Sequence, residues 1–204
     1  MKAIIGRKIG MTQVFDKKGI PQPVTIIEAG PCYISQIKTS QKDGYSAIQL
    51  VFGQTKKINK TAKGHLNKAK ITKDLKNIKE FKVGDPEKYQ PGQEIKVDIF
   101  QTGDKVDIIG ISKGKGFAGV IKRHGFSRGP QTHGSHHHRR PGSIGSMFPE
   151  HVVKGKKMPG HLGSDRVTVK NLPVFKADAD KNILMVRGAV PGSAKNIIQI
   201  KEVK

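Results

Sequence analysis

Residues 113–163 read KGKGFAGVIKRHGFSRGPQTHGSHHHRRPGSIGSMFPEHVVKGKKMPGHLG, and the rest of the chain is arranged around this stretch. It carries ten lysines and arginines but one acid, Glu150, together with seven of the eight histidines and eleven of the 24 glycines. Its few aliphatic residues are too scattered to build a core. A loop of this length inside a compact domain is normally either functional or disordered. We call residues 113–163 the arm.

The sequence on both sides of the arm has the pattern of β-strands. Short runs rich in Ile, Val, Thr and aromatic residues alternate with turn signals such as Gly30-Pro31. In one run Ile48, Leu50 and Phe52 share a face, as in a half-buried strand. The expected strands are residues 3–5, 12–15, 24–28, 33–39, 47–52, 95–99, 106–111, 167–169, 172–175, 183–186 and 197–200. Strands at this spacing predict an antiparallel barrel or sandwich.

The simplest topology is a mainly β fold with one antiparallel barrel. Residues 1–112 plus 164–204 would form this barrel domain, and the arm would leave it and return to it. Residues 56–92 interrupt the β pattern with more lysine and asparagine. We interpret them as a small α/β insertion that contains a short basic helix at residues 61–69. Solvation and RNA contact explain the lysines of this insertion equally well.

The charge of the chain indicates a polyanionic partner. It has 38 lysines and arginines against 16 acids, a formal net charge of +22. Such an excess destabilises a compact protein by self-repulsion, which a polyanion relieves. Nucleic acid is the leading candidate. An anionic membrane is the rival, but it requires a basic amphipathic helix or an apolar anchor, and the sequence shows neither.

The same composition sets the expected compartment. Arg7 and Lys8 interrupt the apolar start too early for a signal peptide. Cys32 is the single cysteine, so neither a disulfide framework nor a thiolate metal cluster is expected. We expect a soluble, intracellular protein with no membrane partner.

Two patterns in the arm would suit an enzyme, but each lacks its context. Residues 114–119 fit G-x-G-x-x-G, yet Arg139 and Arg140 stand near the position where a dinucleotide site needs an acid. These glycines are better explained by close approach of the backbone to a phosphate chain. Residues 125–129 fit the G-x-S-x-G nucleophile elbow, yet Pro130 follows where a helix should begin.

The histidines of the arm do not read as a metal site. Residues 136–138 are three consecutive histidines, whose side chains would point to opposite faces of an extended backbone. Thiolates are missing and acids are few. Histidines among arginines can instead stack on bases and bond phosphate or ribose. We expect no catalytic residue, no metal, no cofactor and no small-molecule substrate.

The arm resembles a segment that orders when a polyanion supplies burial and counter-charge. A flexible basic loop without specific geometry is the alternative reading of the arm. For the whole chain, two other functions remain open. One is an RNA-processing enzyme with a basic substrate clamp, and the other is a nonspecific nucleic-acid binder.

Several motifs closely resemble the universal large-subunit ribosomal protein L-three family in its bacterial form. They are GRKIGMTQVF at residues 6–15, SKGKGF at 112–117, HGS at 133–135, RPGSIG at 140–145, KGKKMPG at 154–160 and VRGAVPG at 186–192. The resemblance covers essentially the whole chain. One departure is Ser146, because some bacterial members have a methylated glutamine just after the Gly-Ser-Ile-Gly motif. The arm also lacks the tryptophan of archaeal and eukaryotic relatives.

The resemblance implies a structural, non-catalytic protein of the large ribosomal subunit. Its barrel would be related to those of translation factors. The arm would thread through rRNA toward the peptidyl-transferase centre, with residues 139–147 innermost. The protein would act early in subunit assembly, with rRNA and neighbouring large-subunit proteins as partners.

On the residues and the resemblance together, we expect fourteen residues of the arm to bind rRNA. They are Lys113, Lys115, Lys122, Arg123, His124, Arg128, His133, His137, Arg139, Arg140, Ser143, Lys154, Lys156 and Lys157.

Overall fold

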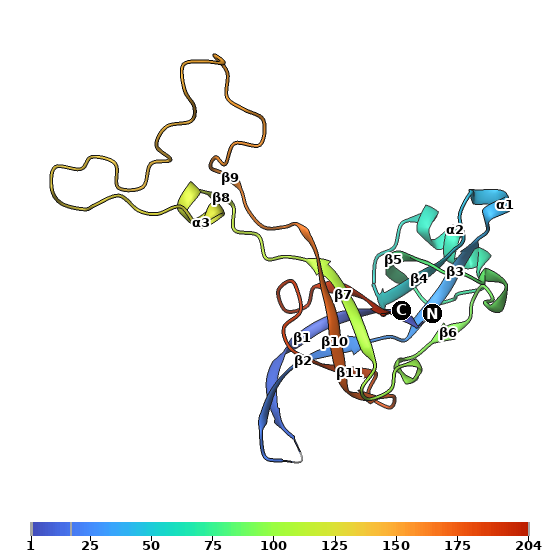
Figure 1. Cartoon of the computed structure of the whole chain (residues 1–204). Helices are drawn as coiled ribbons and strands as arrows, with labels where there is room; N and C mark the ends of the chain where they lie inside the picture. The colour runs from blue at the N-terminus through green and yellow to red at the C-terminus, as the bar shows by residue number, and fades with distance from the viewer. Residues whose placement is uncertain (1, 17, 204) are drawn as a thin grey trace. The chain divides into compact units, whose positions relative to one another are not determined.

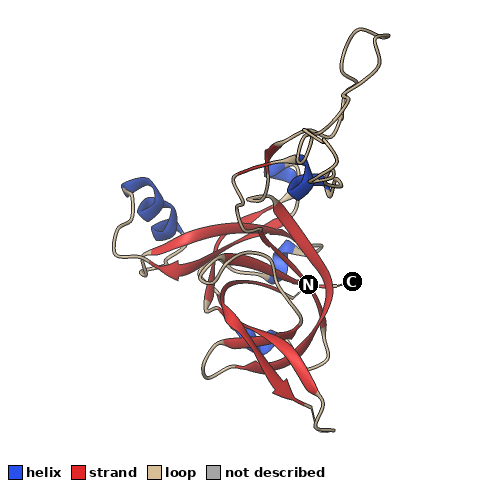
Figure 2. Ribbon diagram, turned by 90° about the vertical axis from the view of Figure 1, so that its left-hand side faces the viewer, coloured by secondary structure: helices blue, strands red, loops and turns tan. Residues whose placement is uncertain are grey.

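The structure, a computed structural model, describes residues 2–16 and 18–203. The chain forms two compact units. Met1–Ile111 and Arg166–Lys204 make up the first, which we call the β unit. Ser112–Asp165 make up the second, the arm unit, which contains the arm. Strands dominate the β unit, whereas loops dominate the arm unit (Figure 2).

Among the described residues, six antiparallel strands close a barrel in the order β1-β12-β7-β10-β11-β2 (Figure 1). They are β1 (Ala3–Phe15), β12 (Ile197–Glu202), β7 (Lys105–Ile111), β10 (Arg166–Asp178), β11 (Ile183–Arg187) and β2 (Pro21–Ala29). The first and last strands pair with each other, from Ala3 opposite Lys201 to Arg7 opposite Ile197. The prediction of a mainly β fold built on an antiparallel barrel is confirmed.

A second sheet, of four strands in the order β5-β4-β3-β6, belongs to the same unit. Its strands are β3 (Cys32–Lys38), β4 (Ala47–Gln54), β5 (Leu75–Lys82) and β6 (Glu94–Ile95). The helices are α1 (Ser40–Asp43), α2 (Lys60–Lys68) and the 3-10 turns η1 (Pro86–Lys88) and η2 (Val97–Ile99). Strand β4 is buried on both faces, because Val51 packs with Leu66 of α2 while Ile48, Leu50 and Phe52 belong to the core shared with the barrel.

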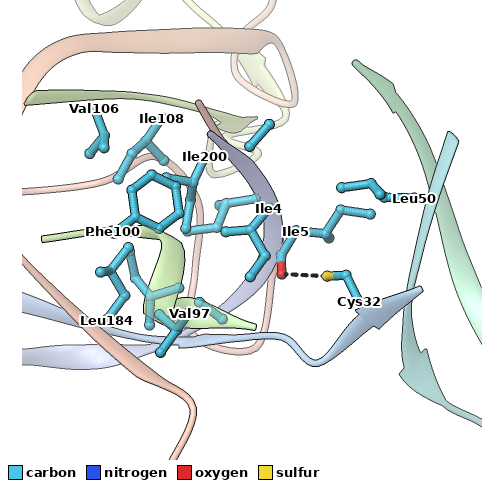
Figure 3. Close-up of a cluster of buried hydrophobic side chains, with 14 of the residues drawn as sticks. Ile4, Ile5, Cys32, Leu50, Val97, Phe100, Val106, Ile108, Leu184 and Ile200 are labelled. Atoms are coloured by element: carbon cyan, nitrogen blue, oxygen red, sulfur yellow. Dashed lines mark hydrogen bonds between the residues drawn. The ribbon is translucent and has the colours of Figure 1, made fainter. Parts of the chain in front are cut away.

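One apolar core joins the barrel to the second sheet. Ile4 and Ile5 of β1 are fully buried, and they lie between barrel residues such as Ile108 and second-sheet residues such as Leu50 (Figure 3). Ile48, Leu50 and Phe52 all belong to this core. The common face predicted for these three residues is therefore confirmed.

The predicted strand at residues 95–99 is wrong. Strand β6 ends at Ile95, and Val97–Ile99 form the 3-10 turn η2. The backbone N–H of Phe100 donates to the carbonyl oxygen of Val97 at 3.1 Å. Residues three apart share one face of a 3-10 helix, so Val97 and Phe100 both enter the core, at 0% and 3% exposure. Alternation of apolar residues did not reveal this tighter turn.

Residues 56–92 contain a strand as well as the expected helix. Helix α2 lies close to the predicted position, but β5 pairs along its length with β4, which precedes the expected insertion. Only Leu75 and Phe81 of β5 are buried, while its three lysines are exposed. Lysines on an edge strand discourage further pairing, and they hid the strand in the sequence.

Two pairs of predicted strands are continuous in the structure. Residues 3–5 and 12–15 both lie in β1, whose pairing with β2 shifts register between Lys8 and Gly10. Residues 167–169 and 172–175 both lie in β10, which shifts register between Val169 and Leu172. β-Bulges carry a strand through an irregular stretch. In the described ranges, no helix has the length and apolar character that a bilayer crossing needs.

Candidate nucleic-acid interface

The arm unit begins and ends in a narrow antiparallel ribbon of residues 112–118 and 160–165. It contains the short strands β8 (Phe117–Ala118) and β9 (Gly160–His161), which pair with each other. Backbone N–H groups of Ser112, Lys115 and Leu162 donate to the carbonyl oxygens of Asp165, Leu162 and Gly116 at 2.9, 2.9 and 3.0 Å. The arm, which the sequence analysis treats as one long loop, therefore contains regular structure in this ribbon.

Gly163 permits the close approach of the two ribbon segments. Its φ is +81°, a conformation that residues with a side chain rarely adopt. A Cβ at this position would also collide with the carbonyl oxygen of Lys113. The ribbon thus requires glycine at position 163 for two independent reasons.

A short helix, α3 (Val120–His124), follows the ribbon. Nη1 of Arg123 and Nε2 of His124 both donate to the carbonyl oxygen of Met158, at 2.7 and 3.0 Å. The guanidinium of Arg123 also lies against Gly160, where a Cβ would come within 2.9 Å of Nη1. Arg123 and His124 therefore hold the returning segment of the arm.

Residues 129–138, which we call the histidine loop, close on themselves. The N–H of Gly129 donates to the carbonyl oxygen of His138 at 3.1 Å, and Nδ1 of His138 donates to the carbonyl oxygen of Pro130 at 2.7 Å. A cavity of about 340 Å³ adjoins this closure. Arg128, Gly129, Gln131, His138 and Arg139 line it. Two predicted binding residues, Arg128 and Arg139, are thus brought to one cavity by the loop.

Residues 139–157, which we call the outer loop, are exposed throughout. Local hydrogen bonds define turns in it. Ser143 Oγ donates to the carbonyl oxygen of Gly145 at 3.0 Å, and the N–H of Glu150 donates to that of Met147 at 2.9 Å. The outer loop therefore has local geometry but no core.

The predicted binding residues distribute over these four parts. Lys113 and Lys115 lie on the ribbon, Lys122, Arg123 and His124 on α3, Arg128, His133 and His137 in or next to the histidine loop, and Arg139, Arg140, Ser143, Lys154, Lys156 and Lys157 in the outer loop. Twelve of the fourteen are exposed, whereas Arg123 and His124 are half-buried.

The positive charge of the arm has no acidic counterpart within the protein. In the part of the chain that the structure describes, every ion pair lies in the β unit. None of the ten lysines and arginines of the arm is therefore paired with a described carboxylate. Exposed and unpaired cations at this density make a surface for a polyanion.

The β unit adds a basic groove of its own. A depression of about 810 Å³ lies between β5 and the barrel strands β7 and β12. Lys76, Lys79 and Arg166 line it, together with one acid, Glu80, and amide side chains such as Asn77 and Gln199. Sequence reasoning did not find this groove, because its residues come from strands far apart in the chain.

Comparison with known proteins decides the family. The family model described as Ribosomal protein L3 matches residues 77–182. The Large ribosomal subunit protein uL3 of Pelotomaculum thermopropionicum is 56% identical over 203 residues, covering 98% of this chain and 96% of that protein. Proteins of the same name from Carboxydothermus hydrogenoformans and Acetivibrio thermocellus are each 55% identical and cover 98% of this chain. The chain belongs to the ribosomal protein L3 family.

Membership of the L3 family confirms the resemblance read from the motifs. The chain is a structural protein of the large ribosomal subunit and takes part in translation on the ribosome, in the cytoplasm. It is not an enzyme. The alternative of an RNA-processing enzyme with a basic clamp is therefore wrong.

The structure shows how this L3-family chain uses the two enzyme-like patterns. Helix α3 does begin directly after Gly119, which the sequence did not predict, but it has five residues and follows a strand paired antiparallel to β9. A dinucleotide site needs parallel strands with a crossover helix. In the second pattern, Gly125 ends α3 with a φ of 72°, as helix-terminating glycines do. One glycine of each pattern therefore lies at an end of α3, and the patterns form neither a dinucleotide site nor a nucleophile elbow.

Three features of the L3-family arm were missed by sequence reasoning. The first is the Met158 carbonyl that binds Arg123 and His124. Contacts of this kind between distant residues leave no sequence signal. The second is the pair of very exposed side chains Met147 and Phe148. A signal for these was available, since two large apolar residues interrupt a polar, glycine-rich stretch. The third is the backbone requirement at Gly163.

Proposed function

We propose that this protein binds large-subunit rRNA directly, mainly through the arm. The observation that carries the proposal is the density of exposed, unpaired cations in a unit that has almost no core. Ala118 and Val120 are its only buried apolar side chains. A segment of this kind gains burial and counter-charge from a folded polyanion.

The mechanism is electrostatic and conformational. Lysines and arginines neutralise phosphates and release counterions. The cavity beside the histidine loop presents Arg128 and Arg139 together, and guanidinium groups bind phosphate through two parallel hydrogen bonds. Histidine and arginine side chains also stack on unpaired bases. The result is recognition of RNA shape combined with general attraction to its backbone.

The parts of the arm divide this work. The ribbon and α3 are already hydrogen bonded within the protein, so they carry the outer parts at little entropic cost. Arg123 and His124 act by positioning, because their donors bind Met158. The twelve exposed members of the predicted set contact rRNA directly. The outer loop, which has no core, takes its final conformation on the RNA.

Within the large subunit, the arm extends toward the peptidyl-transferase centre, with residues 139–147 innermost. The protein joins early in assembly, when rRNA is still open enough to fold around the arm. The motifs shared with the L3 family support this placement, as does the lack of an internal core in the outer loop. Neighbouring large-subunit proteins complete its surroundings.

Binding to large-subunit rRNA fragments across a salt series tests the proposal. Unrelated structured RNA of equal length serves as competitor. We expect one fragment to retain its preference at high salt, since geometry is then being read. Nonspecific binding falls steeply with salt whatever the sequence. Equal binding of both RNAs that collapses together would leave a charged tether without specific recognition, and would contradict the proposal.

A further inference from the structure

The outer loop contains an apolar tip between two basic clusters. From residue 141 to residue 153 the chain has no lysine or arginine. Arg139 and Arg140 precede this stretch, and three lysines follow it within residues 154–157. At its middle, the side chains of Met147 and Phe148 are 87% and 85% exposed. No other large hydrophobic side chain of the described residues is as exposed.

No described part of the protein covers the side chains of Met147 and Phe148. Met147 and Phe148 lie in a turn held by two local hydrogen bonds. Ser146 Oγ donates to the carbonyl oxygen of Phe148, and the N–H of Glu150 donates to the carbonyl oxygen of Met147. The turn holds the side chains away from any core. Exposed apolar groups of this size mark a surface that a partner covers.

We propose that Met147 and Phe148 form an apolar wedge that inserts against bases of the RNA bound by the arm. The proposal rests on the proposed function and adds a second kind of contact to it. The flanking arginines and lysines would bind phosphates, whereas the wedge would bind base surfaces. Methionine, phenylalanine and proline are side chains that enter nucleic-acid stacks in this way, and Pro149 follows directly.

Charge decides for RNA over a protein partner. The outer loop carries five lysines and arginines and one acid, Glu150. Lysine is depleted in interfaces between proteins, whereas three lysines follow this patch within residues 154–157. Cations on both sides of the patch attract it to the phosphate backbone of RNA. The apolar surfaces that its side chains can then contact are the faces of the bases. Stacking on a base is insensitive to base identity and adds affinity that salt does not screen.

A fluorescent variant tests the wedge directly. The chain has no tryptophan, so Phe148→Trp introduces a single indole reporter. On adding large-subunit rRNA to the full-length variant, we expect its fluorescence to be quenched by stacking and shielded from acrylamide. Phe15→Trp is the matched control, because Phe15 is 63% exposed in β1 and outside the arm unit. Its indole should remain accessible to acrylamide in the same complex.

Affinity measurements separate the wedge from the charges. Met147→Ser with Phe148→Ser should weaken rRNA binding about tenfold at every salt concentration, because stacking is lost but phosphate contacts remain. Lys156→Gln with Lys157→Gln should instead make the salt dependence shallower. Both pairs are exposed, so both variants should unfold at the wild-type temperature.

The outcomes distinguish this inference from the proposed function. One outcome is that the indole at position 148 stays accessible and the double serine variant binds rRNA like wild type, while the double glutamine variant binds more weakly. The proposal of an apolar wedge would then be wrong, and the proposal of rRNA binding would stand. If neither variant changes binding, and rRNA has no preference over unrelated RNA, both proposals fail. In assembled large subunits, a photoreactive side chain at position 148 should crosslink to an rRNA base. A crosslink to a ribosomal protein would overturn the wedge.

Discussion

Cys32 illustrates how position sets the chemistry of a single residue. Its side chain is fully buried, and Sγ lies 3.4 Å from the carbonyl oxygen of Ile5, to which it donates (Figure 3). Burial raises the pKa of the Cys32 thiol from an ordinary value near 9.0 to about 12. The thiolate is the reactive form, so the native thiol is protected.

We expect native protein at pH 8 to react with a thiol reagent far more slowly than protein unfolded in urea. Excess reactivity of the native thiol would contradict its burial.

The same pKa sets how the free energy of unfolding depends on pH. The unfolded thiol ionises near pH 9, whereas the folded one stays protonated to about 12. Ionisation therefore favours the unfolded chain, and the free energy of unfolding should fall as pH rises above 9. Cys32→Ala should show a shallower fall, and equal slopes would contradict the assignment.

Gly163→Ala should open the ribbon of the arm unit. Alanine would be strained at a φ of +81° and would collide with the Lys113 carbonyl. Hydrogen exchange at the N–H groups of Lys115 and Leu162 should accelerate, while exchange in the barrel stays unchanged. Gly119→Ala is the matched control, since its φ is −67° and no atom lies within 4 Å of a Cβ there. Unchanged exchange in Gly163→Ala would show that the ribbon tolerates a side chain.

At the scale of elements, strand β7 contributes both to the core and to the surface of the barrel. Ile108 is fully buried in the shared core, whereas Ile111 at the end of the strand is 46% exposed. Ile108→Ala should lower the free energy of unfolding by about 2–5 kcal/mol, because it removes buried methyl groups and leaves a cavity. Ile111→Ala should cost less than about 1 kcal/mol. Urea denaturation measures both, and equal losses would contradict the described packing.

At the scale of the whole molecule, the arm should be removable. Strands β7 and β10 pair as far as Ile111 opposite Arg166, and the N–H of Ser112 donates to the carbonyl oxygen of Asp165 at 2.9 Å. The chain therefore leaves and returns at one point. Replacing residues 113–164 by a two-residue Asn-Gly turn would join Ser112 to Asp165 and close an ordinary hairpin.

This deletion should leave the β unit folded, with an unfolding transition close to that of the full chain. Its affinity for large-subunit rRNA should fall by roughly 100-fold at moderate salt, because ten cations are lost. Residual binding is expected from the basic groove lined by Lys76, Lys79 and Arg166. Circular dichroism and filter binding measure the two effects. Unfolding of the β unit, or undiminished affinity, would contradict this division of work.

Predictability from the sequence differed between the two units. Alternation in β4 revealed the common face of Ile48, Leu50 and Phe52, because side chains of a strand alternate between faces. The alternation rule failed at residues 95–99. Ile95, Val97 and Ile99 are apolar at every second position, but Val97–Ile99 form a 3-10 turn and not a strand. The rule failed again at β5, where lysines on an exposed edge masked the strand. The positions of charged residues in the arm were readable, but their partners were not.

The sequence by itself determined the class of fold, the basic character of the arm and the family. Composition, alternation and motif order are local or additive properties, so they can be read along the chain. The tertiary structure alone decided that β1 pairs with β12, that Arg123 and His124 bind Met158, and that Gly163 lies against Lys113. These contacts join residues distant in sequence. Their energies depend on geometry that forms only when the whole chain has folded.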